Sequence, residues 1–192
     1  MGDEIEVIDP DGFMLTVRLE AVSPDRVEGV VISERPHQPE PEARISIAIA
    51  NLPAPALELV LSRCTEAGAF AFHVFQADRS VARGAKAGRW QTICREAAML
   101  AGRLRVPAVG ALPSLQDVLK AAERPVMLVR GSPDSLARMP SPRDITLLVG
   151  PEGGWSDREL ALVKVKAGLG PRNLRADTAA LVGLAVALAL RE

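Results

Sequence analysis

The sequence predicts an α/β fold in which a parallel sheet carries helices on both faces, preceded by a small β domain. From residue 45 onward, short apolar runs alternate with amphipathic segments of helical period, a pattern typical of strands joined by helices. Residues 1–34 show only strand-like alternation. The proline-rich, polar stretch 35–42 separates the two patterns and indicates a linker. We therefore expect one domain at residues 1–40 and a second at residues 45–192.

The first domain is predicted to consist of antiparallel strands. Ile5 and Val7 alternate with acidic residues, residues 9–12 read DPDG and favour a turn, and residues 15–22 and 27–33 alternate again. This pattern predicts a small antiparallel sheet or barrel.

The second domain is predicted to contain buried strands and amphipathic helices in alternation. The expected strands are residues 45–50, 70–75, 125–129 and 145–149. The expected helices are residues 55–67, ending at Gly68, and residues 87–101, 156–167 and 177–191. The last helix is apolar almost all round, so either the core or a second subunit must cover more than one of its faces.

Composition narrows the class of protein. The chain has 192 residues and is 48% hydrophobic, which suits a globular protein with a substantial core. Cys64 and Cys94 have no paired spacing, so we expect a reduced, cytoplasmic protein without disulfides. The only histidines, His37 and His73, are far apart, so no metal site is expected. The apolar run 179–190 is too short to cross a membrane.

Charge is distributed unevenly along the chain. Residues 1–45 contain eleven acidic and four basic side chains, whereas residues 78–105 contain two acidic and seven basic ones. A basic segment of this kind suits contact with a phosphate backbone, although a solvated charged face gives the same pattern. The candidates for RNA contact are Arg79, Arg83, Lys86, Arg89, Arg103 and Arg105.

A glycine-rich loop follows the predicted strand 145–149. Residues 150–154 read GPEGG, and Ser156 with Glu159 fits a capping box at the start of a helix. A strand, a glycine loop and a helix in this order commonly bind a small molecule at the carboxyl end of a strand. The loop lacks the Lys-Ser or Lys-Thr of a P-loop and the G-x-G-x-x-G of a dinucleotide fold, so phosphate is not the obvious ligand. A tight turn that merely connects strand and helix is the alternative.

The glycine loop has a second motif downstream. GPEGGWS with Glu159, followed by LGPRNLRADTA from Leu169, closely resembles the paired signature of the RsmE family of 16S rRNA methyltransferases, which belongs to the SPOUT superfamily. The usual family forms are GPEGGFS and LG-x-R-ILR-x-ETA. TEAG at residues 65–68 and RWQ at residues 89–91 resemble further family motifs. The resemblance extends more weakly over roughly the whole chain.

This resemblance implies a fold, a cofactor and partners. It implies a trefoil-knotted SPOUT sheet preceded by a PUA-like β-barrel, S-adenosylmethionine as methyl donor, and a homodimer. It also implies methylation of N3 of a uridine near the 3′ end of 16S rRNA in the small ribosomal subunit. The basic start of the family barrel is absent and what remains is acidic, so a truncated barrel is expected.

The resemblance also assigns candidate site residues. Those expected to hold the cofactor are Leu128, Val129, Gly131, Gly150, Pro151, Glu152, Gly153, Gly154, Leu169, Gly170, Asn173, Leu174 and Arg175. Trp155 either stacks on a base or packs at the loop's exit.

Uridine N3 must lose its proton before it can accept a methyl group. An arginine can stabilise the negative charge that develops on the base, and Arg103 and Arg175 are the candidates. Glu96 and Asp177 are candidate proton acceptors, or else ion-pair partners of those arginines. Asp177 replaces the family's usual glutamate.

Two alternative functions remain open at this stage. The acidic start, and Met99-Leu100 where the family commonly has Glu-Gln, favour a non-catalytic RNA- or ribosome-binding module that retains the fold. The other alternative is a SPOUT methyltransferase that acts on another RNA, such as tRNA.

Overall fold

The computed structural model describes residues 2–140 and 143–190, and within them the chain forms two compact units. One unit comprises the described residues up to Glu40 together with the short segment Gly102–Arg105, and the other comprises Pro41–Ala101 and the described residues from Val106 onward. No helix in the described part of the chain is long and apolar enough to span a bilayer.

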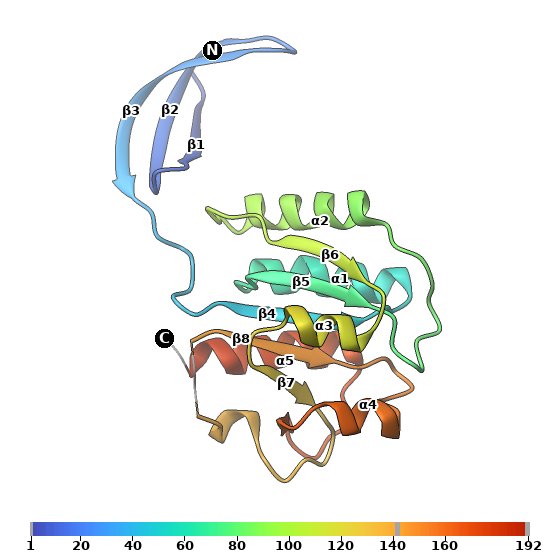
Figure 1. The fold of residues 1–192 in the computed structure, drawn as a ribbon. Coiled ribbons are helices and arrows are strands. Elements are labelled where there is room, and N and C mark those ends of the chain that lie inside the picture. The colour runs from blue at the N-terminus through green and yellow to red at the C-terminus, as the bar shows by residue number, and fades with distance from the viewer. Residues whose placement is uncertain (1, 141–142, 191–192) are drawn as a thin grey trace. The chain divides into compact units, whose positions relative to one another are not determined.

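The first unit is built on a three-stranded antiparallel sheet with strand order β1-β2-β3 (Figure 1). Its strands are β1 (Glu4–Asp9), β2 (Phe13–Val22) and β3 (Val27–Pro36). Gly12 has a φ of +91°, and its N–H donates to the Asp9 carbonyl at 3.0 Å, which closes the predicted turn. The expected strands are confirmed, and the described residues form an open sheet of three strands.

The second unit contains a six-stranded sheet in which every pairing is parallel. The strand order is β6-β5-β4-β8-β7-β9. The strands are β4 (Ile45–Ala50), β5 (Ala71–Phe75), β6 (Ala108–Leu112), β7 (Pro125–Leu128), β8 (Ile145–Val149) and β9 (Lys166–Ala167). Strands β4 and β8 lie side by side at the centre and are almost wholly buried, which explains their continuous apolar runs.

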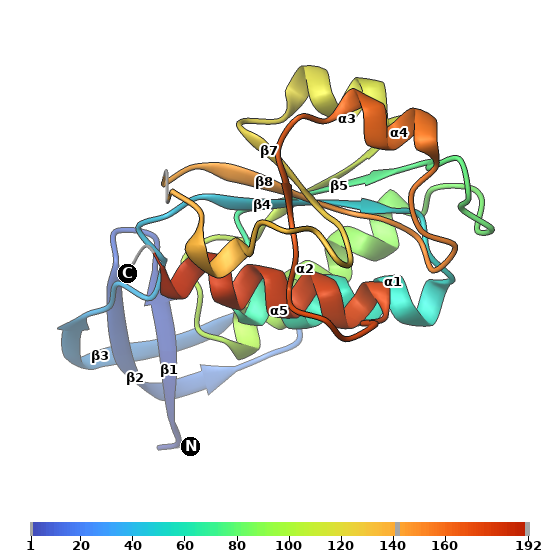
Figure 2. The same cartoon turned by 90° about the horizontal axis from the view of Figure 1, so that it is seen from below.

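Helices cover both faces of this sheet, as the sequence predicts (Figure 2). One face carries α1 (Ala54–Glu66), α2 (Ala87–Leu100) and α5 (Ala176–Ala189), and the other carries α3 (Leu115–Ala121) and α4 (Asp157–Leu162). A short 3₁₀ turn, η1, spans Leu136–Arg138. The larger apolar core lies under α1, α2 and α5, and a smaller one surrounds Phe75 and Met127.

The predicted helix 156–167 is wrong in its second half. Helix α4 ends at Leu162, and the chain becomes extended at Val163, whose ψ is 121°. The following residues form β9, which pairs with β7 through Leu128 and Ala167. The β-branched residues Val163 and Val165 favour this extended path, and β9 satisfies the exposed edge of β7.

Besides β9, three short elements were not predicted, namely β6, α3 and η1. The sequence does carry one signal for α3, because the Ser114 hydroxyl accepts the Asp117 N–H at 3.3 Å as an N-cap. The predicted end of the last helix, Arg191, lies outside the described residues.

Candidate cofactor and RNA site

Three loops meet where β7 and β8 end at the carboxyl edge of the parallel sheet. They are the glycine loop (residues 150–154) after β8, the segment after β7, and the segment of residues 169–175 that leads into α5, which we call the α5 loop. Together they enclose a cavity of about 350 Å³, within the roughly 300–1,000 Å³ typical of small-molecule sites. The two motifs, distant in sequence, therefore share one cavity.

Most of the residues expected to hold the cofactor line this cavity. They are Leu128, Val129, Gly150, Pro151, Glu152, Gly153, Gly154, Leu169, Gly170, Asn173 and Leu174. Gly131 and Arg175 are not among the lining residues. Gly131 lies beyond the end of β7 with a φ of +75°, and Arg175 is the exposed N-cap residue of α5.

Sequence reasoning missed two cationic side chains in the lining, Arg130 and Arg172. The Arg172 guanidinium lies 3.7 Å from the position that a Cβ on Gly170 would occupy, so it folds back over the α5 loop. The sequence did carry a signal for Arg172, because it is the arginine of the LGPR motif at residues 169–172. Arg130 follows directly after Val129 at the end of β7 and has no comparable signal.

Trp155 anchors the exit of the glycine loop. Its indole Nε1 donates to the Leu128 carbonyl at 3.0 Å, and its ring stacks on Phe75 with centroids 6.2 Å apart. The residue is only 9% exposed, so the structure favours packing over base stacking. The indole also lies 2.9 Å from the position of a Cβ on Gly150, which leaves room for glycine alone.

The predicted capping box at the start of α4 is confirmed. Ser156 Oγ accepts the Glu159 N–H at 3.1 Å, and Glu159 Oε2 accepts the Ser156 N–H at 3.0 Å. Glu159 is only 1% exposed, and its second oxygen accepts the backbone N–H of Asp78 at 3.1 Å. A buried carboxylate thus ties the start of α4 to the segment after β5.

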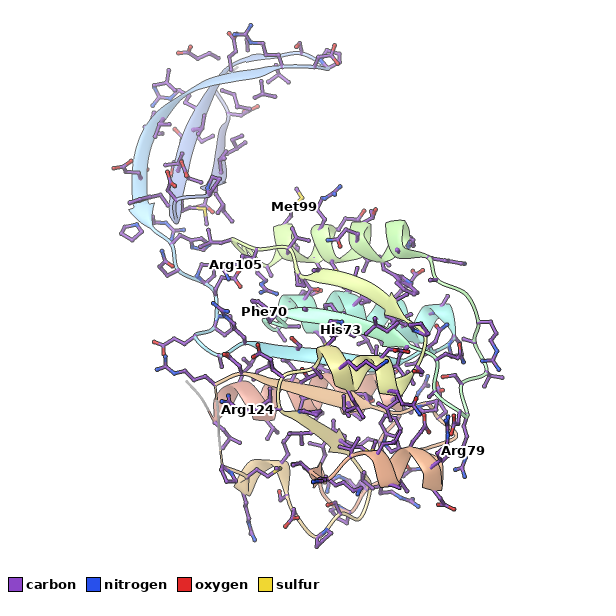
Figure 3. All side chains as sticks on the ribbon, in the orientation of Figure 1. Phe70, His73, Arg79, Met99, Arg105 and Arg124 are labelled. Carbon is purple, nitrogen blue, oxygen red and sulfur yellow. The ribbon has the colours of Figure 1, made fainter. Side chains whose placement is uncertain are left out.

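That segment makes two further contacts with the cavity's surroundings. The Asp78 carboxylate accepts bonds from Arg158 and from Ser156 Oγ, and these bonds hold the pKa of Asp78 below its ordinary value. Arg79 Nη1 donates to the Gly153 carbonyl at 3.0 Å. Figure 3 shows Arg79 beyond the carboxyl ends of the strands, near α4, and Arg124 near the amino ends of the strands.

The residues predicted to contact RNA fall into two groups. Arg79, Arg83, Lys86 and Arg89 are exposed in the second unit, between β5 and the first turn of α2. Arg89 also pairs with Glu58 at 3.0 Å.

Arg103 and Arg105 belong to the first unit. The side chain of Arg103 is 5% exposed and pairs with Glu40 at 2.6 Å, so its guanidinium is turned inward. Arg105 is exposed, and its backbone N–H donates to Glu40 at 3.1 Å.

The four predicted catalytic residues do not come together in the cavity. Arg175 and Asp177 flank Ala176, which lines the cavity, and they form an ion pair at 3.6 Å. Glu96 is exposed on α2, and neither it nor Arg103 lines the cavity.

The lining suits a ligand with both an apolar ring and charged ends. Leu128, Val149, Leu169 and Leu174 supply apolar walls, while the glycines let backbone groups approach closely. Charged groups are present on the same walls, namely Arg130, Glu152 and Arg172. A nucleoside joined to an amino acid has this combination of properties, and the residues present therefore fit S-adenosylmethionine.

Comparison with known proteins gives a consistent picture. A family model for an RNA methyltransferase domain matches residues 38–188. The chain is 32% identical over 205 residues to the ribosomal RNA small subunit methyltransferase E of Bacillus subtilis, a match that covers 95% of this chain and 80% of that protein.

Solved structures resemble the chain over nearly its whole length. The ribosomal RNA small subunit methyltransferase E of Neisseria gonorrhoeae, solved with S-adenosylmethionine, has a TM-score of 0.88 and 26% identity over 98% of this chain and 84% of that one. A methyltransferase of Legionella pneumophila, solved with the same cofactor, has a TM-score of 0.87 and 25% identity over the same shares.

Proposed function

The chain belongs to the RNA methyltransferase family, as the match over residues 38–188 shows, and from this premise we propose that it methylates N3 of a uridine near the 3′ end of 16S rRNA. The general activity, S-adenosylmethionine-dependent methylation of small-subunit rRNA, follows from its relatives. The observation that carries the proposal is the single cavity lined by both glycine-bearing motifs.

The cavity residues would hold the methyl donor. When bound, S-adenosylmethionine supplies an electrophilic methyl group on its sulfonium. The backbone of the glycine loop and of the α5 loop would hydrogen-bond its polar groups, while Leu169 and Leu174 would pack against its adenine ring. This cradle contributes orientation, which by itself lowers the barrier to transfer by several kcal/mol.

The start of α5 carries the groups that would act on the uridine. Arg175 is 74% exposed beside the cavity and would stabilise the negative charge on the base as N3 loses its proton. Arg172 lines the cavity and is a second candidate cation for this role. Arg103 is a weaker candidate because its guanidinium forms an ion pair with Glu40. Asp177 would hold Arg175 in place or accept the proton, and Glu96 remains an alternative acceptor.

The exposed cations after β5 would bind the RNA backbone. Parallel strands all end at the same edge of a sheet, so Arg83, Lys86 and Arg89 follow β5 at the edge where the cavity lies. Arg105 contributes a further exposed cation from the first unit. Each neutralised phosphate adds salt-dependent affinity.

The proposal extends to the wider assembly. A homodimer in which a partner covers part of α5 is supported by the almost entirely apolar character of this helix and by the family resemblance. The trefoil knot and the kinship of the three-stranded sheet to a PUA-like barrel rest on the family resemblance, and a cytoplasmic location rests on the absence of a paired cysteine spacing.

A non-catalytic ribosome-binding module is the second candidate. Met99 is 73% exposed and Leu100 is 80% exposed on α2, where the family commonly has two polar residues. Two adjacent exposed apolar side chains at these positions favour contact with a partner molecule.

The test is methyl transfer from S-adenosylmethionine to small ribosomal subunits taken from a strain that lacks this protein. We expect one methyl group on N3 of a single uridine near the 3′ end of 16S rRNA, located by mass spectrometry of nuclease fragments. Cofactor binding without transfer would favour the ribosome-binding module. Transfer only to tRNA, when tRNA is offered in a parallel reaction, would favour a methyltransferase that acts on another RNA.

A further inference from the structure

We propose that Arg79 is a positioning residue that holds the glycine loop in the form that binds S-adenosylmethionine. The sequence assigns this arginine to RNA contact, as one of several cations in a basic segment. The inference deepens the proposed function and rests on it, because it concerns the same cavity.

The contact between Arg79 and the glycine loop involves both the head and the stem of the side chain. Its Nη1 donates to the Gly153 carbonyl at 3.0 Å. Its Cβ lies 3.2 Å from the position that a Cβ on Gly153 would occupy, so the stem packs directly against the loop backbone. A Cβ at Gly153 would crowd this approach.

Residues on both sides of Arg79 are anchored independently. The Asp78 N–H donates to the buried Glu159 carboxylate at 3.1 Å, and the Asp78 carboxylate accepts the Ser156 hydroxyl at 2.5 Å. On the other side, Ser80 is 4% exposed, and its Oγ accepts the Ala77 N–H at 3.3 Å. Arg79 therefore projects from a fixed base, and its bond can hold the loop.

The glycine loop needs such a restraint. Gly150, Gly153 and Gly154 can adopt many backbone conformations, and ordering them when the cofactor arrives would cost binding free energy. A loop already held in its bound form avoids that cost. Arg83, in the same segment, has no bond to the glycine loop among the described contacts and serves as the matched comparison.

Calorimetric titration of S-adenosylmethionine into the full chain tests this role. Arg79→Ala should raise the cofactor Kd about tenfold, the effect of losing one charge-assisted hydrogen bond. Arg79→Lys, which keeps a charge and a donor, should recover part of that loss. Arg83→Ala should leave the cofactor Kd within about twofold and instead weaken binding of a 16S rRNA fragment at constant salt.

Steady-state kinetics give a second readout. Arg79→Ala should raise KM for S-adenosylmethionine more than it lowers kcat, and its thermal unfolding without cofactor should match that of the wild type. A cofactor Kd for Arg79→Ala equal to that of the wild type, with weakened RNA binding, would overturn the inference and leave the proposed function standing. Failure of the wild type to bind the cofactor would overturn both. If Arg79→Ala does not fold, the comparison of Arg79→Lys with the wild type decides the point.

Discussion

Gly150 lies so close to Trp155 that it has no room for a side chain, and this can be tested by adding one methyl group. An alanine at this position would place its Cβ 2.9 Å from the indole of Trp155, a rigid ring that is also bonded to the Leu128 carbonyl. Gly150→Ala must displace that ring from Phe75, which we expect to cost about 1–3 kcal/mol and to weaken cofactor binding.

Urea unfolding and cofactor titration measure these two effects. Gly110→Ala is the matched control, because a Cβ at Gly110 meets no atom within 4 Å. Equal stability and cofactor affinity for Gly150→Ala and Gly110→Ala would show that the Trp155 contact does not shape the cavity.

Glu159 gives a second prediction at this scale. Its buried carboxylate accepts backbone N–H groups from Ser156 and Asp78 with separate oxygens. Glu159→Gln replaces one acceptor with a donor that faces an N–H, so we expect a loss of about 1–3 kcal/mol in the free energy of unfolding. Chemical denaturation measures it, with the exposed Glu123→Gln as control. A loss no larger than that of the control would contradict the assignment.

The role of a residue could be predicted where a local sequence motif determines the backbone conformation. It could not be predicted where it depends on a side-chain partner that is distant in the sequence. The Ser156–Glu159 capping box and most of the cavity glycines could be read from local sequence. The inward turn of Arg103 toward Glu40 could not, because the two lie sixty-three residues apart. Charge alone makes Arg103 and Arg105 look alike.

At the scale of elements, the long helices could be predicted from local sequence, whereas the short strand β9 depends on pairing with a distant segment. Helices α1 and α2 follow their apolar periodicity closely, and α5 follows its continuous apolar run. The second half of the predicted helix at residues 156–167 was wrong because the edge of β7 takes residues 166–167 as a strand. A two-residue strand is too short for any period to show, so only the pairing reveals it.

The contacts of the segment Gly102–Arg105 with Glu40 predict that the stability of the protein depends on pH. Burial raises the pKa of Glu40, but bonds from Arg103 and the Arg105 N–H outweigh it, so the pKa lies below the ordinary value of 4.5. A lowered carboxyl pKa means that the stabilisation is complete above that ordinary value and is lost as pH falls through the folded-state pKa.

A comparison of Glu40→Gln with the wild type in denaturant at several pH values measures this. The variant should be less stable at about pH 7, and the difference should shrink as pH falls below 4.5 and through the lowered folded-state pKa of Glu40. Glu42→Gln is the control, since the Glu42–Arg143 pair is exposed. A difference that stays constant with pH would contradict the ion-pair account.

At the scale of the whole molecule, a parallel sheet explains why two distant motifs meet. Strands β7 and β8 are neighbours, so the loops that leave their carboxyl ends share one edge, and β9 brings the α5 loop to the same edge. The alternation of strands and helices predicted this class of sheet. The strand order, and with it the cavity, depends on long-range pairing that one sequence does not specify.

Hydrogen exchange with and without S-adenosylmethionine tests most directly whether these two loops form one cofactor site. We predict that peptides covering residues 150–156 and 169–175 slow their exchange together when the cofactor is added, over the same concentration range, while peptides covering β1–β3 do not change. Protection of one loop without the other, or no protection in either at saturating cofactor, would contradict the account.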